Sequence, residues 1–114
     1  MKTLTIKIEQ ETGKVVSGTI KLYESRKKVG YVAYILTKDK HLKLLNLQIE
    51  KPFRLKGYGT LLVNVARGLA KGYKCKKIVL LSLDEAVLFW EKMGFKEKNS
   101  GLGLHYMEYE IKND

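Results

Sequence analysis

The chain has 114 residues, 45% hydrophobic and 30% charged, which suits one globular domain with a single two-layer core. Its formal charge of +10 is compatible with phosphate-rich ligands, nucleic acid or acidic partners, although the lysines are scattered and form no dense basic helix. A lone cysteine, Cys75, excludes an internal disulfide and a multi-cysteine metal site, and no apolar run approaches the ~20 residues of a membrane span. We therefore expect one cytoplasmic domain over residues 1–114, with no metal.

The first half of the chain is predicted to form four strands. Apolar and polar residues alternate over 3–9, and a second strand spans 15–24. Residues 29–37 are apolar on both faces, as expected of a central strand, and 41–50 form the fourth. The turns between these strands are short, the first of them at 11–14, so we expect an antiparallel meander.

The second half of the chain changes to helical spacing. Apolar residues recur every three or four positions over 59–71, where Gly68 is an unfavourable helix residue and Gly72 suits the C-cap. A buried strand follows at 77–82, and Ser82 with Glu85 forms the S-x-x-E pattern of a capping box opening a second helix, which Gly94 ends. With a last strand from 104 to 111, the order β-β-β-β-α-β-α-β predicts an α+β fold, a mixed sheet with helices on both faces.

The segment between the fourth strand and the first helix has the features of a pyrophosphate cradle. Gly57 and Gly59 let the backbone turn and approach a ligand, and Arg54 and Lys56 add positive charge. The free N–H groups of the helix's first turn favour an anion. A dinucleotide fingerprint needs a third glycine where Leu62 stands, and the Gly-Lys-Ser/Thr of a Walker loop is absent.

Two motifs together carry a family resemblance. The run Arg54-x-x-Gly57-x-Gly59 resembles the R/Q-x-x-G-x-G/A signature of GCN5-related N-acetyltransferases, the GNAT family. Residues 86–95, AVLFWEKMGF, resemble the family's A-x-x-F-Y-E-K-x-G-F motif, and 106–109 resemble its last strand. The resemblance covers roughly residues 28–111. It implies direct transfer of an acetyl group from acetyl-CoA to a primary amine, on a small molecule or a protein that the sequence does not identify.

The resemblance also implies where acetyl-CoA binds. In this family the fourth strand splays from the fifth, and pantetheine lies in the gap. Backbone groups beside the gap would then contact pantetheine, the loop would hold the phosphates, and the second helix would wall the thioester end and reach the 3′-phosphate. By position these residues are Leu47, Gln48 and Ile49 on the strand, Arg54, Leu55, Lys56, Gly57, Tyr58, Gly59 and Thr60 in the loop and helix tip, and Phe89, Trp90 and Lys92 on the second helix. For Phe89 and Trp90, ordinary helix packing is the alternative.

The sequence departs from the family in three places. The turn near residue 13 leaves no room for the two helices that the family inserts between its first two strands, so the acceptor cleft should be open or completed by a partner chain, such as a second copy. Trp90 stands where a tyrosine often acts as general acid, and an indole cannot supply a proton. Lys43 and Ile78 stand where many members carry a catalytic glutamate. His41 and Glu50 are the remaining candidate bases, each with a solvated surface role as the alternative.

Two other functions stay open at this point. The missing acid and base suit a non-catalytic acetyl-CoA-binding regulatory module. The charge alone suits a basic nucleic-acid-binding domain, whose affinity would depend strongly on salt.

Overall fold

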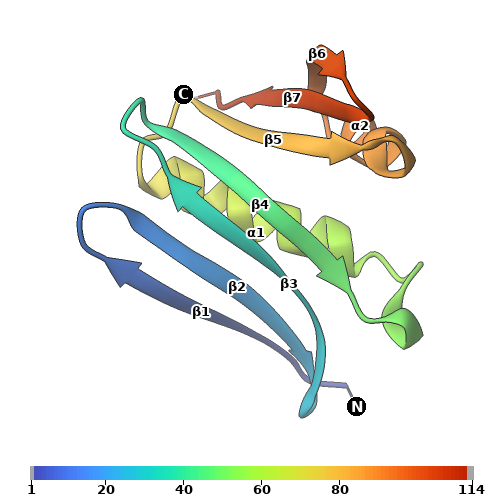
Figure 1. Cartoon of the computed structure of the whole chain (residues 1–114). Coiled ribbons are helices and arrows are strands. Elements are labelled where there is room, and N and C mark those ends of the chain that lie inside the picture. Colours follow the sequence, from blue (N-terminus) through green and yellow to red (C-terminus); the bar gives the residue numbers. More distant parts are fainter. Residues whose placement is uncertain (1, 113–114) are drawn as a thin grey trace.

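Residues 2–112, which the computed structural model describes, form one mixed sheet with two α-helices (Figure 1). The strands lie in the order β1-β2-β3-β4-β5-β7-β6, and only β4 and β5 pair in parallel. The strands are β1 (Leu4–Thr12), β2 (Val16–Glu24), β3 (Lys27–Leu36), β4 (His41–Ile49), β5 (Lys77–Leu83), β6 (Lys96–Gly101) and β7 (Leu104–Glu110), and the helices are α1 (Tyr58–Gly72) and α2 (Val87–Lys92), with 3-10 turns η1 (Lys51–Phe53) and η2 (Asp84–Ala86). The predicted meander and mixed sheet are confirmed.

Three local expectations need correction. Strand β1 continues to Thr12, which pairs with Val16, so the turn lies at 13–15. The polar segment of β6 forms a strand of its own by pairing with β7, a contact that its sequence pattern does not indicate. The capping box does not form, because Ser82 lies buried in β5 and its hydroxyl donates to the Leu83 carbonyl at 2.8 Å.

Both helices pack on one face of the sheet, whereas the sequence predicted helices on both faces. Arg67 of α1 donates a hydrogen bond to the Met93 carbonyl at the end of α2, and the Phe89 ring of α2 packs close to Gly59 of α1. The physical reason is the register of the apolar residues. The buried apolar residues at alternate strand positions line up on the same side across β2, β3, β4, β5 and β7, and the two helices cover this side.

We call this covered side the inner face and the opposite side the outer face. The core lies between the inner face and the helices, and its fully buried members include Ile20, Leu22, Val32, Tyr34, Leu42, Leu62, Val63, Ile78 and Met107. On the outer face no helix from residues 2–112 covers the sheet, and Leu81 and Leu83 are 53% and 55% exposed. The short β1–β2 turn therefore has the expected consequence: the described residues contain no helices between the first two strands.

Two glycines give a matched pair of stability predictions. Gly94 turns the chain after α2 at φ +95°, and a Cβ there would lie 3.2 Å from the Tyr109 ring, whereas Gly68 lies exposed within α1 with open space around it. We expect Gly94→Ala to lower the free energy of unfolding by at least about 1 kcal/mol and Gly68→Ala to raise it by about 0.5–1 kcal/mol. Urea denaturation followed by circular dichroism measures both, and effects of the same sign would contradict this assignment.

Candidate active site

Strands β4 and β5 separate halfway along their length. Their parallel pairing covers only residues 41–44 of β4 and 77–80 of β5. At that point β4 contains a bulge, because Leu44 pairs with Tyr34 and Asn46 with Ala33, which leaves Leu45 without a partner on β3. Beyond the bulge the two strands no longer pair with each other. The predicted splay between the fourth and fifth strands is therefore present.

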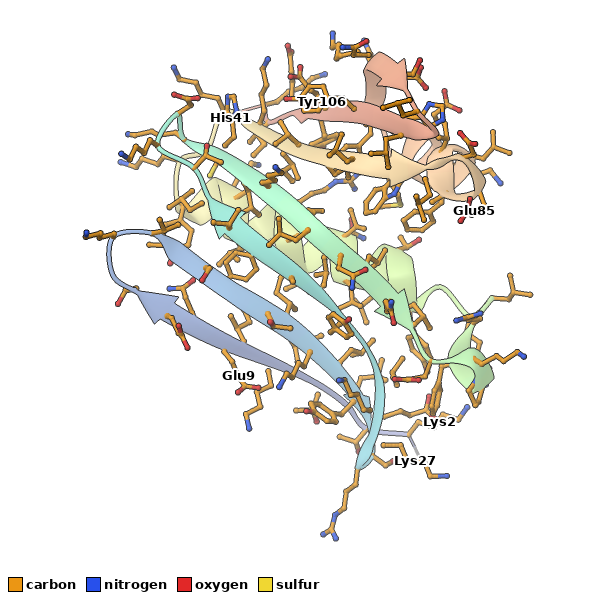
Figure 2. All side chains as sticks on the ribbon, in the orientation of Figure 1. Lys2, Glu9, Lys27, His41, Glu85 and Tyr106 are labelled. Atoms are coloured by element: carbon orange, nitrogen blue, oxygen red, sulfur yellow. The ribbon has the colours of Figure 1, made fainter. Side chains whose placement is uncertain are left out.

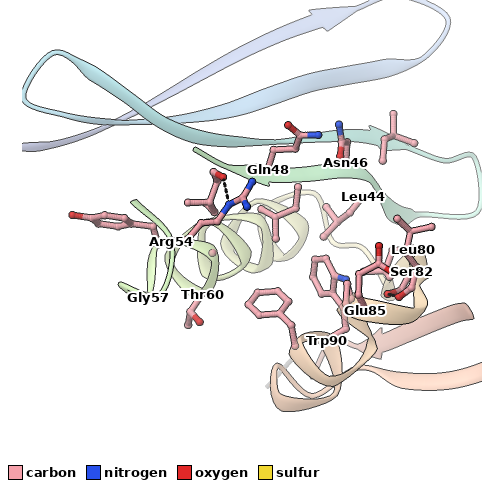
Figure 3. Close-up of a pocket in the computed structure, with 18 of the residues that line it drawn as sticks. Leu44, Asn46, Gln48, Arg54, Gly57, Thr60, Leu80, Ser82, Glu85 and Trp90 are labelled. Carbon is pink, nitrogen blue, oxygen red and sulfur yellow. Dashed lines mark hydrogen bonds between the residues drawn. The ribbon is translucent and has the colours of Figure 1, made fainter. Parts of the chain in front are cut away.

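An open groove of about 1020 Å³ occupies this splay (Figure 3). Its walls come from the end of β4, the loop before α1, the start of α1, the end of β5 and the α2 region. The lining residues are Leu44, Leu45, Asn46, Leu47, Gln48, Ile49, Phe53, Arg54, Leu55, Gly57, Tyr58, Gly59, Thr60, Leu80, Leu81, Ser82, Leu83, Glu85, Ala86, Phe89 and Trp90. Because successive residues of both strands, which point to opposite faces, line it, the groove runs through the gap in the sheet.

The first turn of α1 faces this groove with uncapped amides. Gly57 precedes the helix at φ +84°, and its carbonyl accepts the first helical hydrogen bond, from the Leu61 N–H at 3.1 Å. No side chain caps the helix, so among residues 2–112 the N–H groups of Tyr58, Gly59 and Thr60 have no acceptor. Leu55, at φ +63° and fully exposed, adds a second left-handed turn just before. Free amides and the helix dipole at such a tip favour an anion.

Two side-chain contacts fix the loop and the helix tip to the sheet. The Arg54 Nε donates to the Ile49 carbonyl at the end of β4, at 2.9 Å (Figure 3). The Tyr58 hydroxyl donates to the Glu24 carboxylate at the end of β2, and this hydrogen bond raises the pKa of Tyr58. Arg54 therefore keeps its terminal guanidinium nitrogens available beside the groove while its Nε holds the loop in place.

An aromatic cluster forms the wall opposite the helix tip. Trp90 is 6% exposed and contacts Phe89 and Phe95 edge-on, with ring centroids 5.0 and 5.2 Å apart. Trp90 belongs to the main core and also lines the groove, so helix packing does not exclude the wall role predicted for it.

The family profile described as "Acetyltransferase (GNAT) domain" matches residues 9–97. The chain belongs to this GNAT family. No curated protein sequence matches it closely enough to count as a relative.

Solved GNAT structures share the fold at low sequence identity. A Bacillus subtilis acetyltransferase in complex with CoA is 13% identical, with a TM-score of 0.81 over 96% of this chain and 100% of that one. The PaiA N-acetyltransferase of Thermoplasma acidophilum, in complex with coenzyme A, is 18% identical, with a TM-score of 0.76 over 81% of this chain. The chain spans 59% of the length of that protein. Tetrahymena GCN5 is 16% identical, with a TM-score of 0.76 over 84% of this chain and 69% of that one.

The structure gathers most of the residues that the GNAT resemblance singled out. Of the predicted acetyl-CoA-contacting residues, those on β4, in the loop, at the tip of α1 and on the aromatic wall line the groove, with two exceptions. Lys56 places its ammonium 5.8 Å from the centre of the Phe53 ring, and Lys92 lies exposed in the last turn of α2; neither lines the groove.

The two predicted bases also lie outside the groove. His41 begins β4 and pairs with Lys77, at the end of the β4–β5 pair opposite the splay (Figure 2). Glu50 follows β4, is exposed, and donates its backbone N–H to the Val29 carbonyl at 2.7 Å. The reason lies in the strand direction: the splay opens toward the end of β4, away from His41, and the chain turns away at Glu50 into η1.

Sequence reasoning missed several groove residues, of which Glu85 and Asn46 carry the most chemistry. Asn46 lies just beyond the bulge and donates its side-chain N–H to the Tyr31 hydroxyl at 3.0 Å. Glu85 lies in η2, where the S-x-x-E pattern had suggested a capping role. The signal that could have found it is its place directly after β5, at the edge of the splay.

His105 ties η2 to the β6–β7 hairpin. Its Nδ1 contacts the Glu97 carboxylate at 2.8 Å, and its Nε2 contacts Asp84 of η2. Hydrogen bonds to Asp84 and then to Glu97 raise the pKa of His105 above its ordinary value. The His105 ring therefore links the β6–β7 hairpin to η2, the segment that leads into α2 and the aromatic wall.

This contact predicts a pH-dependent part of the stability. The folded state raises the pKa of His105, so protonated His105 stabilises the fold. This contribution to the free energy of unfolding is fully present below the unfolded-state pKa near 6.5, and it is lost as the pH rises through the folded-state pKa. We expect His105→Gln to lower the melting temperature more at about pH 6 than at about pH 9. Asp84→Asn should also lower the melting temperature more at about pH 6 than at about pH 9. If His105→Gln lowered the melting temperature equally at both pH values, the ion pairs of His105 would not contribute to the stability.

Proposed function

We propose that this GNAT protein is an N-acetyltransferase that transfers an acetyl group directly from acetyl-CoA to a primary amine. One observation carries the proposal: the uncapped tip of α1 opens onto a groove that continues into the gap between β4 and β5. The uncapped tip suits a pyrophosphate, and the gap between the strands suits a long, thin arm that contains amide groups. A ligand with both parts is accommodated by the two features together. The solved GNAT structures with coenzyme A agree with this choice.

The described residues fit acetyl-CoA at three places. The N–H groups of residues 58–60 and the guanidinium of Arg54 would hold the pyrophosphate. The backbone of residues 47–49, which has no strand partner on the β5 side, would pair with the amides of pantetheine. The thioester would then lie near the bulge, with Trp90 at the wall.

The bulge offers a means of stabilising the transition state. Leu45 has no partner on β3, so its backbone N–H can donate toward the thioester oxygen as negative charge develops there. Two reactants held in line gain a large rate factor from proximity alone. The acceptor must attack as a neutral amine, and a lysine-type amine needs about 4 kcal/mol to lose its proton near physiological pH.

Isothermal titration with CoA and acetyl-CoA, combined with a free-thiol assay over a panel of amines, tests the proposal. We expect binding of both nucleotides and amine-dependent release of CoA. Binding without thiol release would favour a regulatory acetyl-CoA-binding module, and salt-sensitive DNA binding without CoA affinity would favour a nucleic-acid-binding domain.

A further inference from the structure

Strand β1 forms one edge of the sheet and leaves an apolar stripe in solvent (Figure 1). Leu4, Ile6 and Ile8 occupy alternate positions of β1 and are 46%, 38% and 44% exposed. Their partners on β2 include Ile20 and Leu22, which are fully buried, so the stripe lies on the inner face of the sheet. The stripe therefore continues the apolar surface of the core to the edge of the sheet, where the protein leaves it uncovered.

The two edges of the sheet differ in their protection against pairing with another chain. At the opposite edge, β6 has six residues, two of them lysines, and a bulge between Glu97 and Asn99 interrupts its pairing with β7. Short length, lysines and bulges are the usual devices that keep an edge strand from adding a further strand. Strand β1 has nine residues, one lysine, no proline and no bulge in its pairing with β2. Of the two edges, β1 is therefore the one open to a further strand.

The unpaired backbone groups at this edge belong to the residues of the apolar stripe. The Ser25 N–H donates to the Thr3 carbonyl at 2.6 Å, so Thr3 directs its backbone groups toward the β2 side. Because these directions alternate along an antiparallel strand, Leu4, Ile6 and Ile8 direct their N–H and carbonyl groups away from β2. The strand order places no strand on that side among residues 2–112. Each stripe residue therefore offers one donor and one acceptor at the open edge.

We infer that two copies of this chain associate by antiparallel pairing of their β1 strands, centred on Ile8. In this register β1 overlaps its counterpart along all nine residues, and about ten backbone hydrogen bonds form across the two-fold axis. Residues directly opposite each other share a face, so the two stripes lie side by side on one continuous inner face. No residue of β1 lines the groove between β4 and β5, so the association is independent of the proposed function.

The charges on the outer face of β1 select this register. Lys7 lies opposite Lys21 of β2, a like charge, and makes no ion pair among the described residues. Glu9 contacts Lys21 and keeps half of its side chain exposed. Centring on Ile8 places Lys7 opposite the partner's Glu9, and two-fold symmetry forms this pair twice. Centring one residue earlier would place Lys7 opposite the partner's Lys7, which opposes pairing.

Amide hydrogen exchange followed by NMR tests the pairing residue by residue, at protein concentrations of about 20 μM and about 1 mM. We expect the Ile6 and Ile8 amides to exchange at least about tenfold more slowly at the higher concentration, because only the dimer gives them acceptors. The Lys7 amide is the internal control, since it points toward β2 and should be protected equally at both concentrations. A monomer in sedimentation at the higher concentration, or a dimer whose Ile6 and Ile8 amides exchange rapidly, would overturn the inference.

Charge reversal tests the register. Lys7→Glu places a carboxylate opposite the partner's Glu9, and Glu9→Lys places an ammonium group opposite the partner's Lys7. We expect either variant alone to dimerise at least about tenfold more weakly in sedimentation velocity. An equimolar mixture should recover the parent affinity, because opposite charges then face each other on both sides of the axis. Lys98→Glu, the same reversal at the exposed β6 edge, is the matched control and should dimerise like the parent protein. No recovery in the mixture, or equal weakening by Lys98→Glu, contradicts the pairing of β1 in this register.

Discussion

Thr60→Glu is expected to abolish most of the affinity for CoA while leaving the fold at least as stable. Thr60 is the third residue of α1, lies exposed and lines the groove. A carboxylate there would bond the free amides itself and would repel a pyrophosphate by about 3 kcal/mol at roughly 5 Å, which corresponds to about a 100-fold higher Kd. The same charge near the helix N-terminus should add about 0.3–1 kcal/mol to the stability.

The matched control is Thr60→Gln, which has nearly the same size and no charge. Isothermal titration should show CoA affinity within a few-fold of the parent protein for this variant, and thermal melts should show that both variants fold. Equal CoA affinity in Thr60→Glu and Thr60→Gln would remove the α1 tip as the phosphate site. Loss of folding in Thr60→Glu would contradict the reading of this tip as free and exposed.

Trp90→Ala is expected to produce the largest loss of stability. The indole is 6% exposed and joins Phe89 and Phe95 in the core beneath α2, a helix of six residues that is too short to persist without packing. Truncating a buried aromatic residue costs about 3–5 kcal/mol, a large part of the total stability of a small domain. Denaturation followed by far-ultraviolet circular dichroism measures the change without relying on the lost fluorophore.

Leu88→Ala is the control on the same helix, because Leu88 is 71% exposed. It should change the free energy of unfolding by no more than about 0.5 kcal/mol. If Trp90→Ala were as mild as Leu88→Ala, Trp90 would be only a wall of the groove. Whatever the stability result, Trp90 cannot act as a general acid, because an indole does not supply a proton.

Local patterns were sufficient for the glycine turn before α1 and for most of the order of the elements. The loop from Arg54 to Thr60 could be recognised because turning at Gly57 and opening a helix next to it are properties of a few adjacent residues. The aromatic stripe of Phe89 and Trp90 follows from helical spacing in the same way. The capping box predicted at Ser82 does not form, because Ser82 is a buried strand residue whose hydroxyl donates to the Leu83 carbonyl. No local pattern reveals this contact.

The side of the groove formed by β5 and η2 depended on contacts between distant segments. Glu85 reaches the groove because β4 and β5 part after Leu44 and because His105, 21 residues away from Asp84, holds η2. His41 and Glu50 fell outside for the same kind of reason: the direction of the splay is a property of the paired strands and not of β4 alone.

By itself the sequence determined most of the strand and helix order, the glycine turn that opens α1, and membership of a family whose motifs are local. Only the tertiary structure decided that both helices share one face, because this depends on how five strands align their apolar residues in register. It likewise decided which carboxylate faces the groove, since that position is set by long-range pairing and packing.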